Sequence, residues 1–300
     1  MRVPDLFIVG APKCGTTALY TYLSQHPEVF MSRVKEPSFF GTDLRNPARP
    51  TSEQYLHLFA GARNEKRVGE ASTSYLGSRR AAAEIKKFSP SSRIVIMLRN
   101  PVEAMYSLHS QRLYQGTEDI TDFETALGAE EERKRGRRLP RRRGVVEGLF
   151  YREGAKYSQQ VKTYLEAFGR ENVHIIIFDD LKHTPAQVYG ETLRFLDAST
   201  EFQIESQVAN PSKRVRVRAL HDFILSPPRT IQRTANLLVP GRVRRLLFAA
   251  LRRLNTAYEP RRPMDPELKR RLQVEFAPEV ERLSQLLCRD LTYWSEEQPF

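Results

Sequence analysis

The sequence predicts an α/β fold of three layers, in which helices cover both faces of a central parallel sheet. Short apolar runs alternate with helix candidates along the chain, as in parallel strands joined by crossover helices. Two runs, RIVIML at 93–98 and VHIIIF at 173–178, are uninterrupted and rich in β-branched residues, which is typical of strands buried on both faces. A glycine-containing turn between the first strand and the first helix adds an anion-binding element.

Each expected element follows from a local pattern. Four strands are expected from apolar runs, at 6–10, 67–71, 93–98 and 173–178. Helices are expected from the spacing of apolar residues, at 16–25, 53–59, 101–113, 157–168 and within 266–294. The helix at 101–113 has Asn100 as its N-cap and Pro101 at its first position, which is a strong start signal.

The 300 residues are expected to form a single domain, residues 1–300, since a chain of this length can bury one ample core. Residues 117–148 interrupt the pattern because they are charged and poor in apolar periodicity, and we predict a mobile basic insertion there. Residues 199–265 are irregular as well, and contain a basic amphipathic segment at 231–254.

The net charge of +12 is unevenly spread. The run RKRGRRLPRRR at 133–143 holds eight basic side chains in eleven residues. Such a surface predicts an anionic partner, namely nucleotide phosphates, an acidic glycan, an anionic membrane face or nucleic acid, with solvated surface as the alternative. We expect no specific nucleic-acid partner, because no aromatic residue interrupts this run.

The two cysteines, Cys14 and Cys288, are far apart in sequence and predict reduced thiols rather than a metal site. The apolar run near the N-terminus is too short for a secretory signal, and no run is long enough to span a membrane. We therefore expect a cytoplasmic protein. A peripheral contact of residues 242–253 with the inner membrane face is a further hypothesis. The alternative is core packing of its apolar side chains, Leu246, Leu247, Phe248 and Leu251.

The stretch FIVGAPKCGTTAL at 7–19 predicts an anion cradle. Gly10 and Gly15 have the spacing of an ATP-binding phosphate loop, but Lys13 lies inside the loop instead of following its last glycine. The hydroxyls of Thr16 and Thr17 add donors to the converging backbone N–H groups. An ordinary strand-to-helix turn is the alternative.

A second stretch, RIVIMLRNPVEAMYSLHSQR at 93–112, places Arg99 at the end of a buried strand, where doubly wound sheets bind ligands. An arginine fork suits a phosphate. Ser107 follows two turns into the next helix and can reach the same group. A salt bridge at the strand end is the alternative for Arg99.

Together these stretches resemble the sulfotransferases that use 3′-phosphoadenosine 5′-phosphosulfate (PAPS). APKCGTTAL resembles the family's 5′-phosphosulfate loop, and RNPVEAMYS resembles its 3′-phosphate motif. VKEPSFF at 34–40 resembles the K-E-x-x-F-F segment of the carbohydrate, heparan-sulfate-type branch, and LLCRDLTYW at 286–294 resembles a C-terminal signature of bacterial members. The resemblance implies a P-loop nucleotide-kinase-like fold and transfer of a sulfuryl group from PAPS.

The resemblance also implies roles for individual residues. Lys13 would neutralise the leaving phosphate, and Arg99 and Ser107 would hold the 3′-phosphate. Residues 210–220 match a loop that caps the nucleotide in the family. The remaining cofactor-binding candidates are Cys14, Gly15, Thr16 and Thr17 in the first loop and Lys213 and Arg214 in the capping loop. No metal is expected to be required.

Glu36, which matches the family's glutamate base, is the expected base for the acceptor, with Phe39 and Phe40 as walls that could raise its pKa. A salt bridge between Lys35 and Glu36 is the alternative. Glu70, in the segment GEASTSY, and His109 are the rival candidates for the base.

The acceptor is expected to be a hydroxyl, or as second choice an amine, of a carbohydrate, a glycolipid or another small molecule. Two alternative functions remain: a P-loop kinase that uses ATP and magnesium held by Asp179, and a basic polyanion- or nucleic-acid-binding protein. The oligomeric state is not predicted.

Overall fold

The computed structural model describes residues 2–142, 144–202, 213–215, 243, 250–251, 254–258 and 261–296. Its centre is a parallel sheet of five strands in the order β2-β3-β1-β4-β5. The strands are β1 (Leu6–Gly10), β2 (Val29–Met31), β3 (Arg67–Ala71), β4 (Arg93–Leu98) and β5 (Val173–Ile177). All four strands expected from apolar runs are present, and every side chain of β1 is buried.

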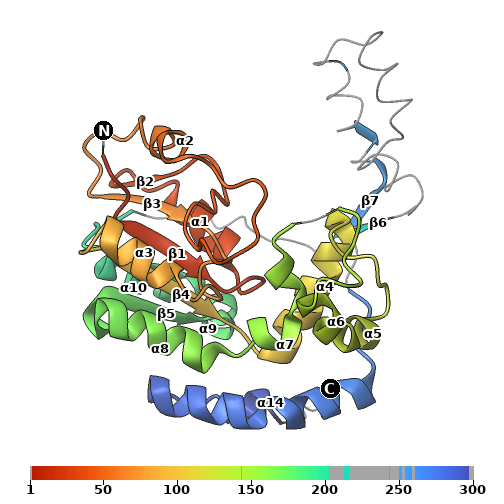
Figure 1. Ribbon diagram of the computed structural model, residues 1–300. Coiled ribbons are helices and arrows are strands. Elements are labelled where there is room, and N and C mark those ends of the chain that lie inside the picture. The colour runs from red at the N-terminus through yellow and green to blue at the C-terminus, as the bar shows by residue number, and fades with distance from the viewer. Residues whose placement is uncertain are drawn as a thin grey trace.

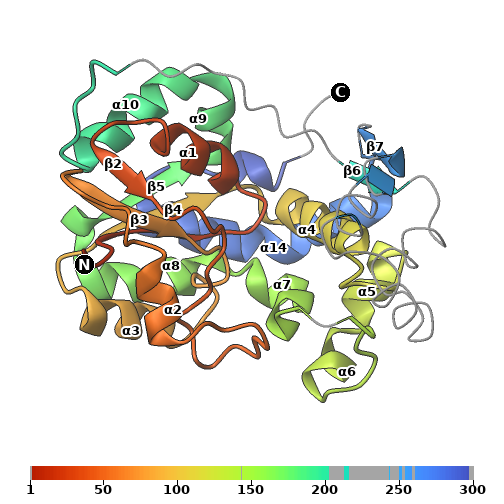
Figure 2. The ribbon, with the colours of Figure 1, turned by 90° about the horizontal axis from the view of Figure 1, so that it is seen from above.

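The helices cover both faces of this sheet. The helices of the described residues are α1 (Thr16–Leu23), α2 (Ser52–His57), α3 (Ala81–Phe88), α4 (Pro101–Gln115), α5 (Phe123–Gly128), α6 (Glu130–Lys134), α7 (Tyr151–Gly154), α8 (Tyr157–Phe168), α9 (Phe178–His183), α10 (Pro185–Phe195) and α14 (Pro266–Leu287), of which α5, α6 and α7 lie beside the sheet. The 3₁₀ turns are η1 (Val146–Leu149), η2 (Arg170–Asn172) and η3 (Thr292–Trp294). In Figure 1, α14 lies beneath α8. In Figure 2, α1, α9 and α10 lie on one side of the strands and α3 and α8 on the other, so the predicted three-layer fold is confirmed.

The order of the strands positions the functional region. Strand β1 lies between β3 and β4, and β4 follows β3 in the chain, so the carboxyl ends of these three strands open into a common crevice. The register pairs Ile8 with Ala71 in β3 and with Val95 in β4. The segments that begin after Gly10, Ala71 and Leu98 therefore start side by side.

The predicted helix start at Asn100 is confirmed, because its side chain accepts hydrogen bonds from the backbone N–H groups of Val102 and Glu103. The sequence analysis missed β2, α3, α9 and α10. Strand β2 has three residues, which is too short for a pattern, and α3 has only eight residues, of which the buried ones are Ala81, Ala82 and Ile85.

Residues 117–148 are more ordered than the sequence analysis predicts. Helices α5 and α6 form there, and Phe123 of α5 packs with Met105 of α4 and Leu272 of α14 in a second hydrophobic cluster. Arg133, the first residue of the arginine run, is fully buried and forms a bidentate ion pair with Glu118. At this position the expectation of a solvated basic face is wrong, because a buried carboxylate needs the guanidinium.

Much of 199–265 lies outside the described residues, including Leu246, Leu247 and Phe248. The short antiparallel strands β6 (Lys213–Val215) and β7 (Thr256–Tyr258) pair there, with Lys213 opposite Tyr258. Leu251 and Leu254 are exposed. Within the described ranges, no helix is both long and apolar enough to cross a membrane.

Candidate functional site

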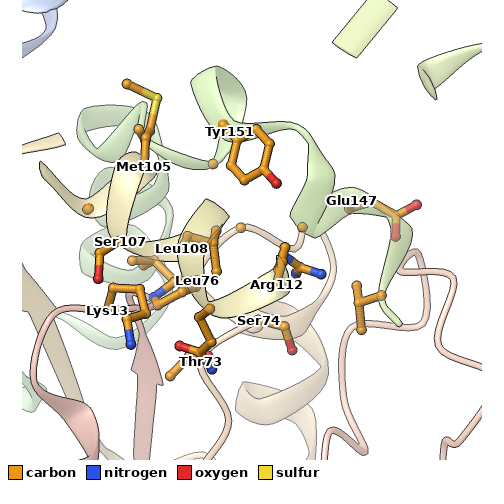
Figure 3. A pocket seen from close by; sticks show the side chains of 18 of the residues that line it. Lys13, Thr73, Ser74, Leu76, Met105, Ser107, Leu108, Arg112, Glu147 and Tyr151 are labelled. Carbon is orange, nitrogen blue, oxygen red and sulfur yellow. The ribbon is translucent and has the colours of Figure 1, made fainter. Parts of the chain in front are cut away.

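An open cavity of about 2130 Å³ occupies the crevice at the carboxyl ends of β1, β3 and β4 (Figure 3). The loop after β1, the loop after β3, helix α4 and the segment 144–157 form its walls. Its lining includes seven of the predicted residues, namely Lys13, Gly15, Thr16, Thr17, Glu36, Arg99 and Ser107. The two strand-end motifs therefore pack around one space, as the sequence analysis expects.

The loop after β1 is held close to its neighbours. A Cβ atom at Gly10 would lie 2.5 Å from the Leu76 Cβ, so only glycine permits this approach. Gly15 has a φ of 89° and is the N-cap of α1. The backbone of the loop and the N-terminus of α1 therefore face the cavity with positive potential.

Lys13 lines the cavity without a carboxylate partner among the described residues. Burial, together with the positive charges of Arg261 and Arg99, lowers its pKa to about 8. Three cations thus share one partly buried volume, an arrangement that an anionic ligand stabilises.

Cys14 and the two threonines contribute differently. The Cys14 thiol is fully buried 3.9 Å from the Tyr157 hydroxyl, and burial raises its pKa to about 12. Cys14 therefore has an inert side chain and offers only its backbone. Thr16 is buried, Thr17 is exposed, and both border the cavity.

Arg99 and Ser107 are brought together as predicted. The Arg99 guanidinium lies 4.8 Å from the centre of the Phe178 ring, and its Nη2 is 3.4 Å from a Glu103 carboxylate oxygen. Ser107 is buried, and its hydroxyl accepts a hydrogen bond of 3.0 Å from Nη2 of Arg261. The alternative of a salt bridge for Arg99 is present as its contact with Glu103, and Arg99 also borders the cavity.

Arg261 is a site residue that the sequence analysis missed. Its guanidinium lies 5.5 Å from the centre of the Tyr106 ring, and its Nε is buried without a hydrogen-bond partner. Burial and the charge of Arg99 lower its pKa. The residue stands in EPRRP, within a segment already rich in arginine, so no local pattern distinguishes it.

Glu36 faces the same cavity as Lys13. One carboxylate oxygen accepts hydrogen bonds from the backbone N–H (3.1 Å) and the hydroxyl (2.9 Å) of Thr73. The other oxygen lies 3.6 Å from Nζ of Lys35. The predicted salt bridge and a position suited to a base are therefore both present, and Thr73 is a further site residue that the sequence analysis missed.

Three other expectations need correction, namely the Phe39 and Phe40 walls, Glu70 and His109. Phe39 and Phe40 do not wall the cavity, because their rings pack against Tyr55 and Phe88 in the core. Glu70 is fully buried behind the cavity wall.

The Glu70 carboxylate accepts hydrogen bonds from the hydroxyls of Tyr55 (2.7 Å), Tyr75 (2.9 Å) and Ser72 (2.6 Å). Burial raises its pKa to about 7. His109 is also buried, with Nε2 2.9 Å from the Ile120 carbonyl and its ring against Phe123. Neither residue lies where it could contact a ligand in the cavity.

Lys213 and Arg214 are described by their backbone alone, in β6, and their predicted contacts lie outside the described side chains. Asp179 does not face the cavity, because its carboxylate accepts hydrogen bonds from Trp294 Nε1 (2.9 Å) and the Tyr293 hydroxyl (3.2 Å). In the part of the chain that the structure describes, no group of three or more acidic, histidine or cysteine side chains is placed to hold a metal ion. Cys14 and Cys288 are free thiols, as predicted.

Comparisons with known proteins add an independent finding. A family model described as a sulfotransferase domain matches residues 3–222. Bifunctional heparan sulfate N-deacetylase/N-sulfotransferase 1 of Caenorhabditis briggsae is 26% identical over 233 residues, which cover 73% of this chain and 25% of that protein. Human carbohydrate sulfotransferase 15 is 33% identical over 148 residues, which cover 35% of this chain and 26% of that protein. The chain thus spans about a quarter of the length of these relatives.

Solved structures agree with the family match. A sulfotransferase from Alicyclobacillus acidocaldarius has a TM-score of 0.74 and 29% sequence identity, with 99% of this chain and 100% of that chain covered. Mouse sulfotransferase SULT7A1 complexed with PAP has a TM-score of 0.51 and 12% identity, with 96% of this chain and 87% of that chain covered, and so shares the fold.

Proposed function

Since this chain belongs to the sulfotransferase domain family, we propose that it transfers a sulfuryl group from PAPS to an acceptor hydroxyl. The observation that carries the proposal is the meeting of Lys13, Arg99 and Arg261 in one cavity that also contains Glu36. Three cations suit the charged phosphates of a nucleotide, and a carboxylate beside them suits the proton of an acceptor.

The described residues fit the two ends of such a nucleotide. Arg99, Arg261 and the Ser107 hydroxyl offer donors to the 3′-phosphate, and the unpartnered Nε of Arg261 is available to it. At the other end, Lys13, the loop backbone and the Thr16 and Thr17 hydroxyls border the cavity and would surround the 5′-phosphosulfate. PAPS would supply the sulfuryl group and a phosphate leaving group.

In the proposed reaction, a bond forms between the acceptor oxygen and sulfur while the bond from sulfur to the bridging oxygen breaks. Glu36 takes the acceptor proton, held in position by Thr73. Lys13 stabilises the negative charge that grows on the departing phosphate, an interaction that is strongest in the transition state.

The names of the curated relatives support a carbohydrate acceptor, and a lipid-linked glycan would meet the same requirement. A cytoplasmic location, with a peripheral contact at the inner membrane face, stays our prediction from the sequence. The kinase alternative loses its proposed magnesium ligand, because Asp179 is engaged by Trp294 and Tyr293.

The test is a calorimetric titration with 3′-phosphoadenosine 5′-phosphate (PAP) in the absence of magnesium, with ADP and ATP as controls. We expect tight binding that is lost when the 3′-phosphate is absent. Arg99→Ala should weaken PAP binding, whereas Lys13→Ala should lower turnover with PAPS far more than affinity, as measured by acceptor-independent PAPS hydrolysis or by sulfation of a screened acceptor. Binding of ATP with magnesium alone would reject the proposal.

A further inference from the structure

Arg112 stands in α4, five positions after Ser107, and lines the same cavity. Figure 3 shows Lys13 and Ser107 on one side of the pocket and Arg112 with Ser74 on the other. Arg112 therefore lies away from the residues assigned to the nucleotide, at the end of the cavity left for the acceptor.

The Arg112 guanidinium has no counter-ion among the described residues. Its Nε is buried without a hydrogen-bond partner, and no ion pair of the described side chains includes it. Arginine does not lose its proton in proteins, so this is a partly buried positive charge that forms no ion pair with the described side chains. Burial lowers the pKa of Arg112, because it disfavours the charged form of the guanidinium.

The neighbouring carboxylates are already engaged. Both oxygens of Glu118 accept from Arg133, and one also accepts from the Tyr151 hydroxyl. Glu147 is bound by the Arg45 side chain at 2.8 Å and by the Arg45 backbone N–H. Glu36, whose charge also acts on Arg112, is engaged by Thr73 and Lys35. Each of these three carboxylates therefore has another partner.

Two further polar groups lie unpaired at this end of the cavity. The hydroxyl oxygens of Ser74 and Thr117 are buried without a hydrogen-bond partner, and both residues line the cavity. A Cβ atom at Gly144 would lie 3.5 Å from Thr117 Cγ2 and 3.8 Å from Arg112 Nη1, so these two side chains border the same glycine.

Gly148 of η1 makes room for the guanidinium. A Cβ atom there would lie 1.6 Å from Nη2 and 2.6 Å from Cζ of Arg112, so the charged group lies directly against the backbone of η1. The side chain is therefore held in place by packing instead of by an ion pair, and its Nε remains an unused donor.

We propose that Arg112, assisted by Thr117 and Ser74, forms an acceptor subsite for an acidic group, either a carboxylate or a sulfate ester. The subsite rests on the proposed function, because it is assigned to the end of the cavity that remains when the nucleotide takes the Lys13 end. The acceptor is accordingly an acidic molecule whose reacting hydroxyl reaches Glu36 while its acid contacts Arg112.

The test compares the wild-type protein with Arg112→Gln, Arg112→Lys and a control, Arg79→Gln. Arg79 also lines the cavity, but its side chain is 87% exposed. Binding of methyl β-glucuronide, N-acetylglucosamine 6-sulfate and neutral methyl β-glucoside is measured by ligand-observed NMR, with and without PAP. Thermal unfolding of each variant is recorded in parallel.

We expect the wild-type protein and Arg79→Gln to bind at least one acid about tenfold more tightly than the neutral glucoside, in line with a charge-assisted contact. Arg112→Gln should lose this preference, and Arg112→Lys should keep part of it. Arg112→Gln should unfold at the same or a higher temperature, because it removes a partly buried charge that forms no ion pair with the described side chains. A purely structural arginine would lower that temperature.

Preference for the glucuronide identifies a carboxylate site and preference for the sulfated sugar a sulfate-ester site. The proposal is overturned if the wild-type protein does not prefer either acid, or if Arg112→Gln retains the preference. Failure of the wild-type protein to bind PAP would reject the proposed function alone, because the subsite is judged from the difference between the Arg112 variants.

Discussion

Lys13 is a residue of the cavity whose charge depends on pH above neutrality. Burial and the charges of Arg261 and Arg99 lower its pKa to about 8 in the free protein, and a bound phosphate would raise it again. Affinity for PAP should therefore fall as the pH rises above about 8, by up to roughly tenfold per pH unit. Calorimetric titrations from about pH 7 to about pH 9.5 would measure this decline.

The matched variant is Lys13→Arg, which keeps its proton throughout this range and should bind PAP with nearly constant affinity. If the wild-type protein and Lys13→Arg lose affinity in parallel, titration of Lys13 is not the cause.

Glu70 gives a second prediction at this scale, on the free energy of unfolding. Its pKa is about 7 in the folded protein, against 4.5 for an ordinary glutamate, so the folded state binds the additional proton between these values. Stability must then fall as the pH rises from about 4.5 to about 7, by an amount on the order of 3 kcal/mol.

Glu70→Gln should remove this loss, and should be more stable than the wild-type protein at about pH 8 by about 1–3 kcal/mol, with little difference at about pH 5. Urea denaturation at the two pH values measures it. Glu53→Gln, an exposed change in α2, is the control and should follow the wild-type protein at both pH values, because it retains Glu70. A stability of the wild-type protein that does not change with pH would contradict the role given to Glu70.

At the scale of elements, the buried pair of Arg133 and Glu118 joins α6 to the segment after α4. The guanidinium makes two hydrogen bonds, of 2.8 and 2.7 Å, and the Tyr151 hydroxyl adds a third at 2.8 Å. Burial alone would raise the pKa of Glu118, but these bonds hold it below its ordinary value. Arg133→Met should therefore lower the free energy of unfolding by about 3–5 kcal/mol, since it leaves a buried carboxylate without compensation.

Arg135→Met is the control in the same run, because Arg135 is exposed, and it should change stability by less than about 0.5 kcal/mol. Chemical denaturation followed by circular dichroism compares the two. Equal changes in the free energy of unfolding for the two variants would mean that Arg133 contributes no more than an exposed arginine of the same run.

At the scale of the whole molecule, residues 289–294 form hydrogen bonds and an ion pair with the segments that follow the carboxyl ends of β4 and β5. Trp294 donates its indole N–H to Asp179 after β5, and the Trp294 carbonyl accepts from the Asn100 side chain after β4. Arg289 forms a bidentate pair with Asp180. The family-like signature LLCRDLTYW thus holds two strand ends in place.

Trp294→Phe keeps most of the ring but removes the donor, so it should destabilise the protein by about 1–3 kcal/mol in urea denaturation. Tyr293→Phe removes the longer bond of 3.2 Å to the same carboxylate and should cost less. A larger loss of stability for Tyr293→Phe than for Trp294→Phe would mean that Tyr293 makes the more important hydrogen bond to Asp179.

The meeting of Lys13, Arg99 and Ser107 in one cavity was predictable from the sequence because they stand in two compact motifs at strand ends. Lys13, Arg99 and Ser107 converge once the sheet order brings β1 and β4 together. The other end was not predictable, because Ser74, Arg112 and Thr117 belong to no periodic pattern and meet only through the packing of residues 144–151. Likewise, Arg133 could not be separated from the exposed arginines around it, since burial depends on the distant carboxylate of Glu118.

Because Gly148 has no side chain, a substitution there would affect the position of Arg112 without affecting the opposite side of the pocket. A glycine codon becomes an alanine codon by one base change, and the added methyl group would collide with the flexible end of Arg112 and displace it. Lys13 and Ser107, on the opposite side of the pocket, would be untouched. Under the proposed function, a lineage could therefore alter its choice of acceptor in a single mutational step while it keeps the residues proposed to bind the donor.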